Sequence, residues 1–245
     1  MSHGSPEAIA SGGAAVRTMF DAISPRYDLA NRLMSFGVDP AWRRAAVRAL
    51  APAPGARVLD VATGTGDLAL ALAKAVGPTG RVVGCDFSPA MLARAPAKAA
   101  ALARRTPIAS LAWCRADGLA LPFADRAFDL ATIAFGIRNT ADPARCAREL
   151  FRVVRPGGAV AVLEFGQPTN PLFAPMYRAY SRFAIPLIGG LVTGVPSAYR
   201  YLPRTAAAFP SGPAFAALMG DAGFADVVVQ PLTFGIAWLY VGRVR

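Results

Sequence analysis

The densest group of chemically useful side chains follows an apolar run early in the chain. Residues 58–67 read VLDVATGTGD, a buried strand that leads into a glycine turn and then a helix. Gly64 and Gly66 allow the backbone to approach a ligand closely at the carboxyl end of that strand. Asp86 ends the next predicted strand, about 20 residues further on, the usual offset for a carboxylate that accepts hydrogen bonds from a ribose. This spacing indicates a site for a nucleoside-containing cofactor.

The charges around the turn bear on which cofactor binds. Because Gly64-x-Gly66-x-x-Ala69 also satisfies the dinucleotide fingerprint, spacing alone allows either NAD or S-adenosylmethionine. A pyrophosphate would lie beside Asp60 and Asp67, and like charges about 4 Å apart cost several kcal/mol. The sulfonium and ammonium groups of S-adenosylmethionine are attracted by the same carboxylates. We therefore expect S-adenosylmethionine and retain an NAD-dependent oxidoreductase as an alternative. The residues expected to bind the cofactor on this reasoning are Asp60, Gly64, Gly66 and Asp86.

An alternation of strands and helices must position these residues. The residue patterns predict strands at 57–62, 81–85, 109–114, 128–135 and 159–165, with helices at 67–76, 89–104 and 143–154. Such alternation implies right-handed crossovers and a parallel sheet. After a further helix at 213–222, strands at 227–230 and 236–241 are so closely joined that they must be antiparallel. The expected fold is α/β, by analogy the Rossmann-like class I methyltransferase fold: a mostly parallel seven-stranded sheet with a closing antiparallel hairpin.

The length and composition favour one domain. The 245 residues are 54% hydrophobic and 17% charged, which excludes a disordered chain. We expect a mobile tail at 1–15 and a single domain at 16–245. That domain includes a helical segment at 16–50 and a partly helical insertion over the ligand cleft at about 167–210.

The charge, cysteine content and hydropathy narrow the function classes. The formal net charge is +11, but the arginines are scattered, so we expect no nucleic-acid partner. A basic nucleic-acid-binding module or an RNA methyltransferase remains the alternative of a different class. Cys85, Cys114 and Cys146 are too far apart to indicate a disulfide framework or a metal site. No segment has the pattern of a signal peptide or a membrane span, so we expect a cytoplasmic protein.

Several further segments carry a family resemblance. The chain resembles the quinone C-methyltransferases of menaquinone and ubiquinone biosynthesis from about Val16 to its C-terminus. The family-specific segments are Met19-Phe20-Asp21, Tyr27-Asp28, Ser35-Phe36-Gly37, Trp42-Arg43, Phe135-Gly136-Ile137-Arg138-Asn139, Leu163-Glu164-Phe165, Tyr199-Arg200-Tyr201-Leu202 and Phe209-Pro210. The resemblance implies cofactor contacts from Thr65, Asp86, Asp117 and Gly118, and from Ala134, where many relatives have serine.

The chain departs from the family pattern in two places. Pro196-Ser197-Ala198 and Arg204-Thr205 flank the paired tyrosines, where relatives have acidic residues, and Trp238-Leu239-Tyr240 replaces the usual Ala-Leu-His. These departures leave the cofactor assignment intact but bear on which quinone is bound.

The activity implied is methyl transfer to a ring carbon of demethylmenaquinol, with a ubiquinone precursor or another lipophilic phenol as alternatives. The phenol must lose its proton, which requires a base or a cation that lowers its pKa. Arg138 could stabilise the phenolate or hold a water that takes the proton, or it could instead pair with an acid such as Asp142. Asp28 and Tyr201, with Tyr27 and Tyr199, are further candidates. The one histidine, His3, lies in the expected tail and is a poor candidate.

The apolar insertion indicates which molecules the protein contacts. Residues 172–195 fit a polyprenyl tail or contact with a membrane surface, and they equally fit the core of a lid. The basic residues nearest to this segment, which could dock on anionic lipid, are Arg178, Arg182, Arg200 and Arg204. The expected partner is therefore a polyprenylated quinol, together with peripheral contact at the inner face of the membrane.

Overall fold

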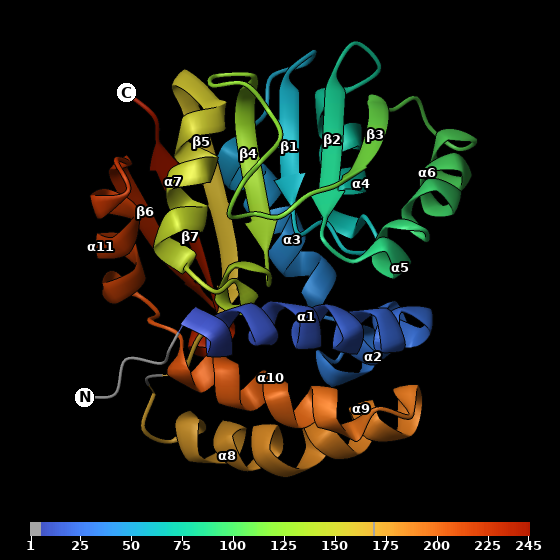
Figure 1. Ribbon diagram of the computed structural model, residues 1–245, viewed down its shortest axis with the longest axis vertical. Coiled ribbons are helices and arrows are strands. Elements are labelled where there is room, and N and C mark those ends of the chain that lie inside the picture. The colour runs from blue at the N-terminus through green and yellow to red at the C-terminus, as the bar shows by residue number, and fades with distance from the viewer. Residues whose placement is uncertain (1–5, 169) are drawn as a thin grey trace.

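A seven-stranded sheet organises the protein, as Figure 1 shows for the computed structural model, which describes residues 6–168 and 170–245. The strand order is β3-β2-β1-β4-β5-β7-β6. The first five strands are parallel, whereas β7 pairs antiparallel with both β5 and β6. The predicted fold class, a mostly parallel sheet with a closing antiparallel hairpin, is confirmed. The strands are β1 Arg57–Val61, β2 Arg81–Asp86, β3 Ser110–Arg115, β4 Phe128–Ala134, β5 Val154–Phe165, β6 Ala225–Leu232 and β7 Ala237–Arg243.

Helices cover both faces of the sheet. On one face, α3 (Asp39–Leu50) and α4 (Asp67–Val76) pack through residues such as Trp42 and Leu72. On the other face, α7 (Pro143–Val153) and α11 (Pro213–Asp221) pack through Leu150 and Phe215. Each face buries its own apolar cluster, which holds the strands in register and fixes where they end.

A third helical layer lies across the carboxyl ends of the parallel strands, at the bottom of Figure 1. Its apolar cluster joins the N-terminal helices to the insertion through Ile23, Ala30, Met34, Ile185 and Tyr199. This layer is built from α1 Pro6–Ile23, the 3-10 turn η1 Ser24–Arg26, α2 Tyr27–Met34, α8 Phe173–Ala179, the π-helical turn η3 Tyr180–Ala184, α9 Ile185–Thr193 and α10 Pro196–Ala208. The insertion is thus helical over most of its length and covers the sheet edge where the predicted site lies.

Some element bounds differ from the sequence predictions. Helix α1 begins at Pro6, within the segment 1–15 for which the sequence predicts a mobile tail. The predicted helix 89–104 is two helices, α5 Pro89–Leu92 and α6 Ala95–Ala103. Pro96 explains this division, because its nitrogen has no hydrogen to donate and it therefore stands in the first turn of α6. Strand β5 begins at Val154, before the expected Pro-Gly-Gly turn. Short 3-10 turns lie at η2 Ile137–Asn139 and η4 Thr233–Gly235.

Two sequence expectations concern His3 and membrane spans. His3 lies outside the described residues. Within residues 6–168 and 170–245, no helix combines the length and the apolar character needed to cross a bilayer.

Candidate functional site

The glycine turn lies between β1 and α4, at the edge of the sheet covered by the helical layer. Gly64 and Gly66 have positive φ values of 57° and 89°, conformations that favour glycine. The indole of Trp113, on β3, packs over this turn. A Cβ atom at Gly66 would lie 2.9 Å from Trp113 Cη2, and one at Gly84 would lie 2.5 Å from Trp113 Cζ3. The turn therefore depends on glycine both for its backbone conformation and for this close packing.

Asp86, at the end of β2, connects the turn with the neighbouring loop. Its Oδ2 accepts a hydrogen bond from the Gly64 amide at 2.8 Å, and its Oδ1 accepts one from the Ser88 amide at 2.9 Å. Burial outweighs these two bonds and raises the pKa of Asp86 above its ordinary value. Each oxygen keeps a further lone pair, so the carboxylate is fixed in place and can still accept from a diol.

Asp117 and Gly118 follow the end of β3 at the same edge. The Ala116 amide donates to the carbonyl of Asp86 at 3.1 Å, which places Asp117 beside the end of β2. Asp117 Oδ1 accepts from the Leu119 amide at 2.9 Å, so the side chain also stabilises a local turn. A Cβ atom at Gly118 would lie 3.3 Å from Cys146 Sγ, which leaves little room for another residue.

Asp60 is the most buried carboxylate beside the turn. It is 1% exposed and accepts hydrogen bonds of 2.6 Å from the hydroxyls of Thr63 and Thr132. Burial raises its pKa to about 6, against the effect of these two bonds and of Arg43. Asp60 therefore lies under the turn as a carboxyl that ionises at an unusually high pH.

The N-terminal helices are attached to the turn through polar side chains. Asp28 accepts 2.6 Å and 2.8 Å bonds from Thr65 Oγ1 and Lys98 Nζ, and Lys98 also pairs with Asp67. Burial acts to raise the pKa of Asp28, but the bonds from Lys98 and Thr65 outweigh it, so the pKa is lowered. A carboxylate with a lowered pKa is a weak base. Since Lys98 pairs with Asp67, the sequence argument that treats Asp67 as a free negative charge overstates its contribution.

Two cavities meet at this edge of the sheet. The smaller, of about 30 Å³, adjoins the glycine turn and is lined by residues that include Asp60, Thr65 and Ala134, the last of these ending β4. The larger, of about 460 Å³, lies between the N-terminal helices and the insertion. Tyr27 and Arg43 line both cavities. The site thus divides into a small polar compartment and a large apolar one, with these two side chains between them.

The larger cavity is lined mainly by apolar and aromatic side chains. Its volume is within the usual range for sites that hold small organic ligands. Phe36 and Met176 line it and are also 78% and 62% exposed, so the cavity opens at the outer face of the helical layer. An apolar ligand could therefore enter from that face and reach the polar compartment.

Arg138, in η2 after β4, is a nearly buried cation that lines the larger cavity. Its Nη1 donates to Glu164 Oε1 at 2.6 Å and to the carbonyl of Phe135 at 2.7 Å. The alternative raised from the sequence, that Arg138 pairs with an acid such as Asp142, is confirmed for the pairing but wrong about the partner. Asp142 instead accepts a hydrogen bond from the Arg145 amide at the start of α7. Burial raises the pKa of Glu164, with the nearby Arg138 charge acting against it. Nε of Arg138 is buried without a hydrogen-bond partner among the described residues.

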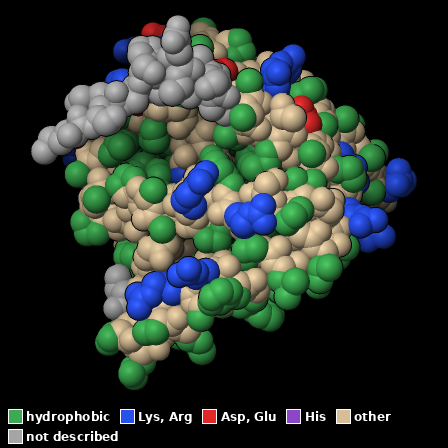
Figure 2. All heavy atoms as spheres, turned by 60° about the horizontal axis from the view of Figure 1, so that its bottom comes forward, with side chains coloured by type: hydrophobic (Ala, Val, Ile, Leu, Met, Phe, Trp, Pro, Cys, Tyr) green, Lys and Arg blue, Asp and Glu red, His purple; other side chains and the backbone are tan. Residues whose placement is uncertain are grey.

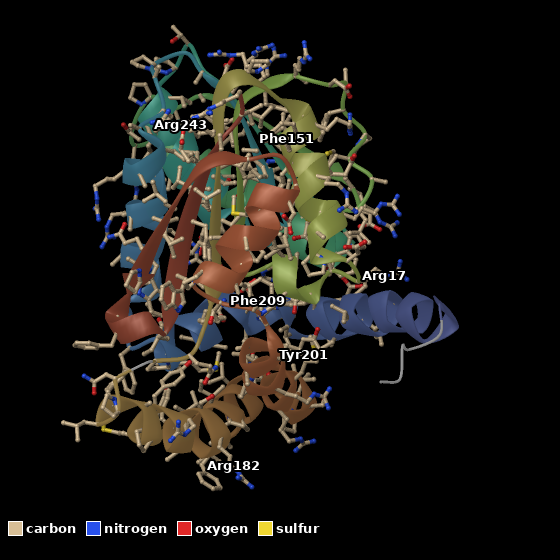
Figure 3. All side chains as sticks on the ribbon, turned by 90° about the vertical axis from the view of Figure 1, so that its left-hand side faces the viewer. Arg17, Phe151, Arg182, Tyr201, Phe209 and Arg243 are labelled. Carbon is tan, nitrogen blue, oxygen red and sulfur yellow. The ribbon has the colours of Figure 1, made fainter. Side chains whose placement is uncertain are left out.

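Of the predicted tyrosines, Tyr27 begins α2, whereas Tyr199 and Tyr201 lie on α10. Tyr201 lines the larger cavity, and its hydroxyl donates to Asn139 Oδ1 at 3.2 Å. Figure 3 shows Tyr201 on the side of the helical layer nearer the sheet, whereas Arg182 lies at the end of the molecule far from it. Tyr199 is buried, and its ring packs against Gly189 of α9, where a Cβ atom would approach it to 2.1 Å. Tyr199 therefore packs within the insertion and also lines the larger cavity.

Three charged residues at the site have no assigned role in the sequence prediction. Arg43 and Glu164 occur within segments that carry the family resemblance, and this resemblance is the sequence signal that could have identified both as site residues. Lys98 lies on α6, 31 residues after Asp67, and no motif connects the two. Helix packing, which the local sequence does not specify, brings Arg43 and Lys98 to the turn, whereas Glu164 lies on β5 and pairs with Arg138.

The arrangement fits S-adenosylmethionine. Asp86 is held with free lone pairs for a ribose, and the turn exposes backbone to a close ligand. Asp60 supplies negative charge beside the small cavity, to which Asp67 adds less because it pairs with Lys98. The adjoining apolar cavity provides space for a second, lipophilic ligand. Such a pair of sites can hold two reactants with their reacting groups together and away from water.

Comparison with known proteins identifies a family of methyltransferases, in agreement with the site described above. A family model described as the ubiE/COQ5 methyltransferase family matches residues 9–243. The chain is 52% identical to a demethylmenaquinone methyltransferase of Thermus thermophilus, over 91% of this chain and 99% of the relative. It is 49% identical to a ubiquinone/menaquinone biosynthesis C-methyltransferase UbiE of Syntrophotalea carbinolica, over 94% of each chain.

Solved structures share the fold at low identity. A SAM-dependent methyltransferase from Thermotoga maritima has a TM-score of 0.65 and 18% identity, over 93% of this chain and 99% of that one. The [4+2]-cyclase SpnF has a TM-score of 0.59 and 18% identity, over 94% of each chain. Because this fold also occurs in a cyclase, the fold alone does not specify the reaction.

Proposed function

The chain belongs to the ubiE/COQ5 methyltransferase family, and on that premise we propose that it transfers the methyl group of S-adenosylmethionine to a ring carbon of demethylmenaquinol. The observation that carries this proposal is the apolar cavity of about 460 Å³ that meets the small cavity of the glycine turn at Tyr27 and Arg43. Family membership favours this activity over the NAD-dependent oxidoreductase and the nucleic-acid-binding module.

The residues around the glycine turn would hold the cofactor. Asp86 would accept hydrogen bonds from the ribose hydroxyls, Asp117 would accept one from the adenine amino group, and Gly64, Gly66 and Gly118 would allow close approach of the backbone. Thr65 and Ala134 line the small cavity beside the turn. The cofactor, when bound, supplies an electrophilic methyl group on a positively charged sulfur.

The larger cavity would orient the quinol and exclude water. Its aromatic and aliphatic lining, which includes Phe135, Phe165 and Tyr177, suits a naphthalene ring and a prenyl chain. Arg138 presents a positive charge to this cavity and stabilises the phenolate that forms when the ring hydroxyl loses its proton. With the cofactor bound, loss of the phenol proton to water would place electron density on the ring carbon, which would take up the methyl group while S-adenosylhomocysteine leaves. The ring carbon would then release its hydrogen as a proton and the ring oxygen would take up a proton, so that the quinol is restored with one proton released overall. Neutralisation of opposite charges in this step is favoured in a dry site.

Tyr201 and Asn139 complete the polar side of this cavity. The Tyr201 hydroxyl donates to Asn139 Oδ1 at 3.2 Å, and Asn139 follows Arg138 in η2. Burial raises the pKa of Tyr201, so its phenol stays protonated and acts as a hydrogen-bond donor rather than as a base. The lowered pKa of Asp28 makes it a weak base, so its role in this proposal is to position the turn.

The test is a methyl-transfer assay with radiolabelled S-adenosylmethionine. We expect labelled menaquinol from reduced demethylmenaquinone, with Arg138→Ala lowering kcat at least about tenfold while the Kd of the cofactor is unchanged. Arg148→Ala, at an exposed arginine on α7, is the matched control. The panel includes a ubiquinone precursor and a simple lipophilic phenol. Transfer to one of these but not to demethylmenaquinol would replace the substrate, and no transfer to any quinol would refute the proposal.

We further propose that the outer face of the insertion docks on an anionic membrane. Figure 2 shows basic and hydrophobic side chains together on this face, with few acidic ones. The exposed apolar side chains are Leu172, Met176, Phe183, Leu187 and Leu191, and the exposed arginines are Arg178, Arg182, Arg200 and Arg204. Residues 167–210 contain no acidic residue. Each basic residue near an anionic surface contributes about 1 kcal/mol of binding, and the cavity opens on this same face.

Sedimentation with lipid vesicles tests this docking. We expect binding to phosphatidylglycerol vesicles and little binding to phosphatidylcholine vesicles. Leu187→Asp with Leu191→Asp should abolish it, whereas Val228→Asp, at an exposed apolar residue of β6, should not. Equal binding of the two variants to anionic vesicles would contradict the assignment of this face.

A further inference from the structure

The small cavity beside the glycine turn has one feature that the cofactor contacts above leave unused. It is lined by two carboxylates, Asp60 and Asp67, and by the guanidinium of Arg43. The amino-acid end of S-adenosylmethionine carries both an ammonium and a carboxylate. The two aspartates suit the ammonium, but they repel the carboxylate, which needs a cation close to the turn.

Arg43, on α3, is placed between the two cavities and lines both. Its side chain is only 12% exposed. Its guanidinium carbon lies 5.9 Å from the centre of the Phe135 ring, so one side of the group packs against an aromatic residue. Burial acts to lower its pKa, but Asp67, Asp39 and Tyr27 outweigh this effect, and the cation is maintained.

The hydrogen-bond donors of Arg43 are only partly used. Nη1 donates to Asp39, a buried carboxylate that also accepts from the Ser35 hydroxyl at 3.0 Å. Among the residues that the structure describes, Nε and Nη2 have no hydrogen-bond partner, and neither is sealed away from the cavities. A guanidinium fixed at one nitrogen with further donors free is suited to bind a carboxylate.

The two other cations of the site are engaged elsewhere. Lys98 Nζ contacts oxygens of Asp28, Thr65 and Asp67 and does not line the small cavity. Arg138 lines only the larger cavity and is held by Glu164. Arg43 is therefore the cation that the described part of the chain presents to the small cavity.

We infer that Arg43 binds the carboxylate of the methionine moiety of S-adenosylmethionine and that Asp39 positions Arg43 for this role. The inference rests on the proposed function, because it assumes that this cofactor occupies the glycine turn. Asp86 and Arg43 then hold the two ends of the cofactor, the ribose and the amino acid. The sulfonium lies between these ends in the covalent structure and would therefore be held between Asp86 and Arg43.

Calorimetry with two ligands tests this assignment. Decarboxylated S-adenosylmethionine keeps the adenosine, the sulfonium and the amine but lacks the carboxylate. We expect Arg43→Met to raise the Kd for S-adenosylmethionine about tenfold or more and to change the Kd for the decarboxylated ligand less than about twofold. Arg43→Lys should restore part of the loss. Arg44→Ala, at the exposed neighbouring arginine, should leave both affinities unchanged.

Each other outcome has a distinct meaning. An equal loss of affinity for both ligands would overturn the assignment and make Arg43 a structural residue. Unchanged affinity for both ligands with a lower kcat would also overturn it and place Arg43 on the quinol instead. If the unsubstituted protein binds neither ligand, the proposed function itself fails. If Arg43→Met does not fold, Arg43→Lys and the preference of the unsubstituted protein for the carboxylated ligand decide the question.

Discussion

Replacement of Asp60 by asparagine should remove a pH-dependent destabilisation of the folded state. Asp60 is 1% exposed and receives hydrogen bonds from the hydroxyls of Thr63 and Thr132. An asparagine has nearly the same shape, and both hydroxyls can rotate to pair with its oxygen and its amide nitrogen. The substitution therefore removes the titrating group with little change in packing.

The magnitude follows from the pKa of Asp60. Burial raises this pKa from 3.8 to about 6, so the folded state favours the protonated carboxyl. The resulting contribution to stability is fully present below the unfolded-state pKa and is lost as the pH rises through about 6. The whole difference corresponds to about 3 kcal/mol, and about 2 kcal/mol of it is lost between pH 4 and pH 7.

Urea unfolding followed by circular dichroism measures this effect. We expect Asp60→Asn to gain about 2 kcal/mol relative to the unsubstituted protein as the pH rises from 4 to 7. Other carboxyl groups titrate alike in both proteins, so their contributions cancel in the difference. The same variant should bind S-adenosylmethionine more weakly, because it lacks a negative charge beside the small cavity. A stability difference that does not vary with pH would refute the reasoning.

Two further substitutions test the rest of the site. Asp86→Ala should raise the Kd for S-adenosylmethionine about tenfold or more in calorimetry, because the ribose loses a charged acceptor. The control, Asp226→Ala in an exposed surface ion pair, should leave this Kd unchanged. If Asp86→Ala and the unsubstituted protein bind the cofactor with equal affinity, Asp86 is not part of the cofactor site. Glu164→Gln should lower the free energy of unfolding, measured in urea, by about 3–5 kcal/mol, because it leaves the buried charge of Arg138 without its partner. Adding Arg138→Met should recover most of that loss. If Glu164→Gln alone is as stable as the unsubstituted protein, the ion pair is not needed for folding.

Local signals determined much of the fold. Helix α4 has the predicted bounds, Asp67–Val76, because Gly66 and Gly77 flank it and its interior is rich in leucine and alanine. The alternation of strands and helices predicted the parallel sheet, and the short turn before β7 predicted the antiparallel hairpin. The strand order could not be predicted in this way, because it depends on pairs such as β1 with β4, which lie about 70 residues apart along the chain.

The same limit applies to the site. The positions of Asp60 and Asp86 followed from the sequence, because the parallel strands all end at one edge of the sheet. The partner of Arg138 did not, because Glu164 is on the adjacent strand β5 and 26 residues away, whereas Asp142 is near only in sequence. Arg43 and Lys98 reach the turn from helices on different sides, and only the packed structure brings them together.

The contact of Trp113 with Gly66 and Gly84 has a consequence for protein engineering. Since the indole fills the space that a side chain at either glycine would need, neither glycine can gain a side chain while Trp113 is kept, and Gly66 is constrained by its positive φ as well. A library aimed at accepting bulkier methyl-donor analogues should therefore keep Gly66 and vary positions 84 and 113 jointly, with a smaller residue at 113 whenever 84 gains a methyl group. The same coupling should appear as correlated substitutions among homologous genes.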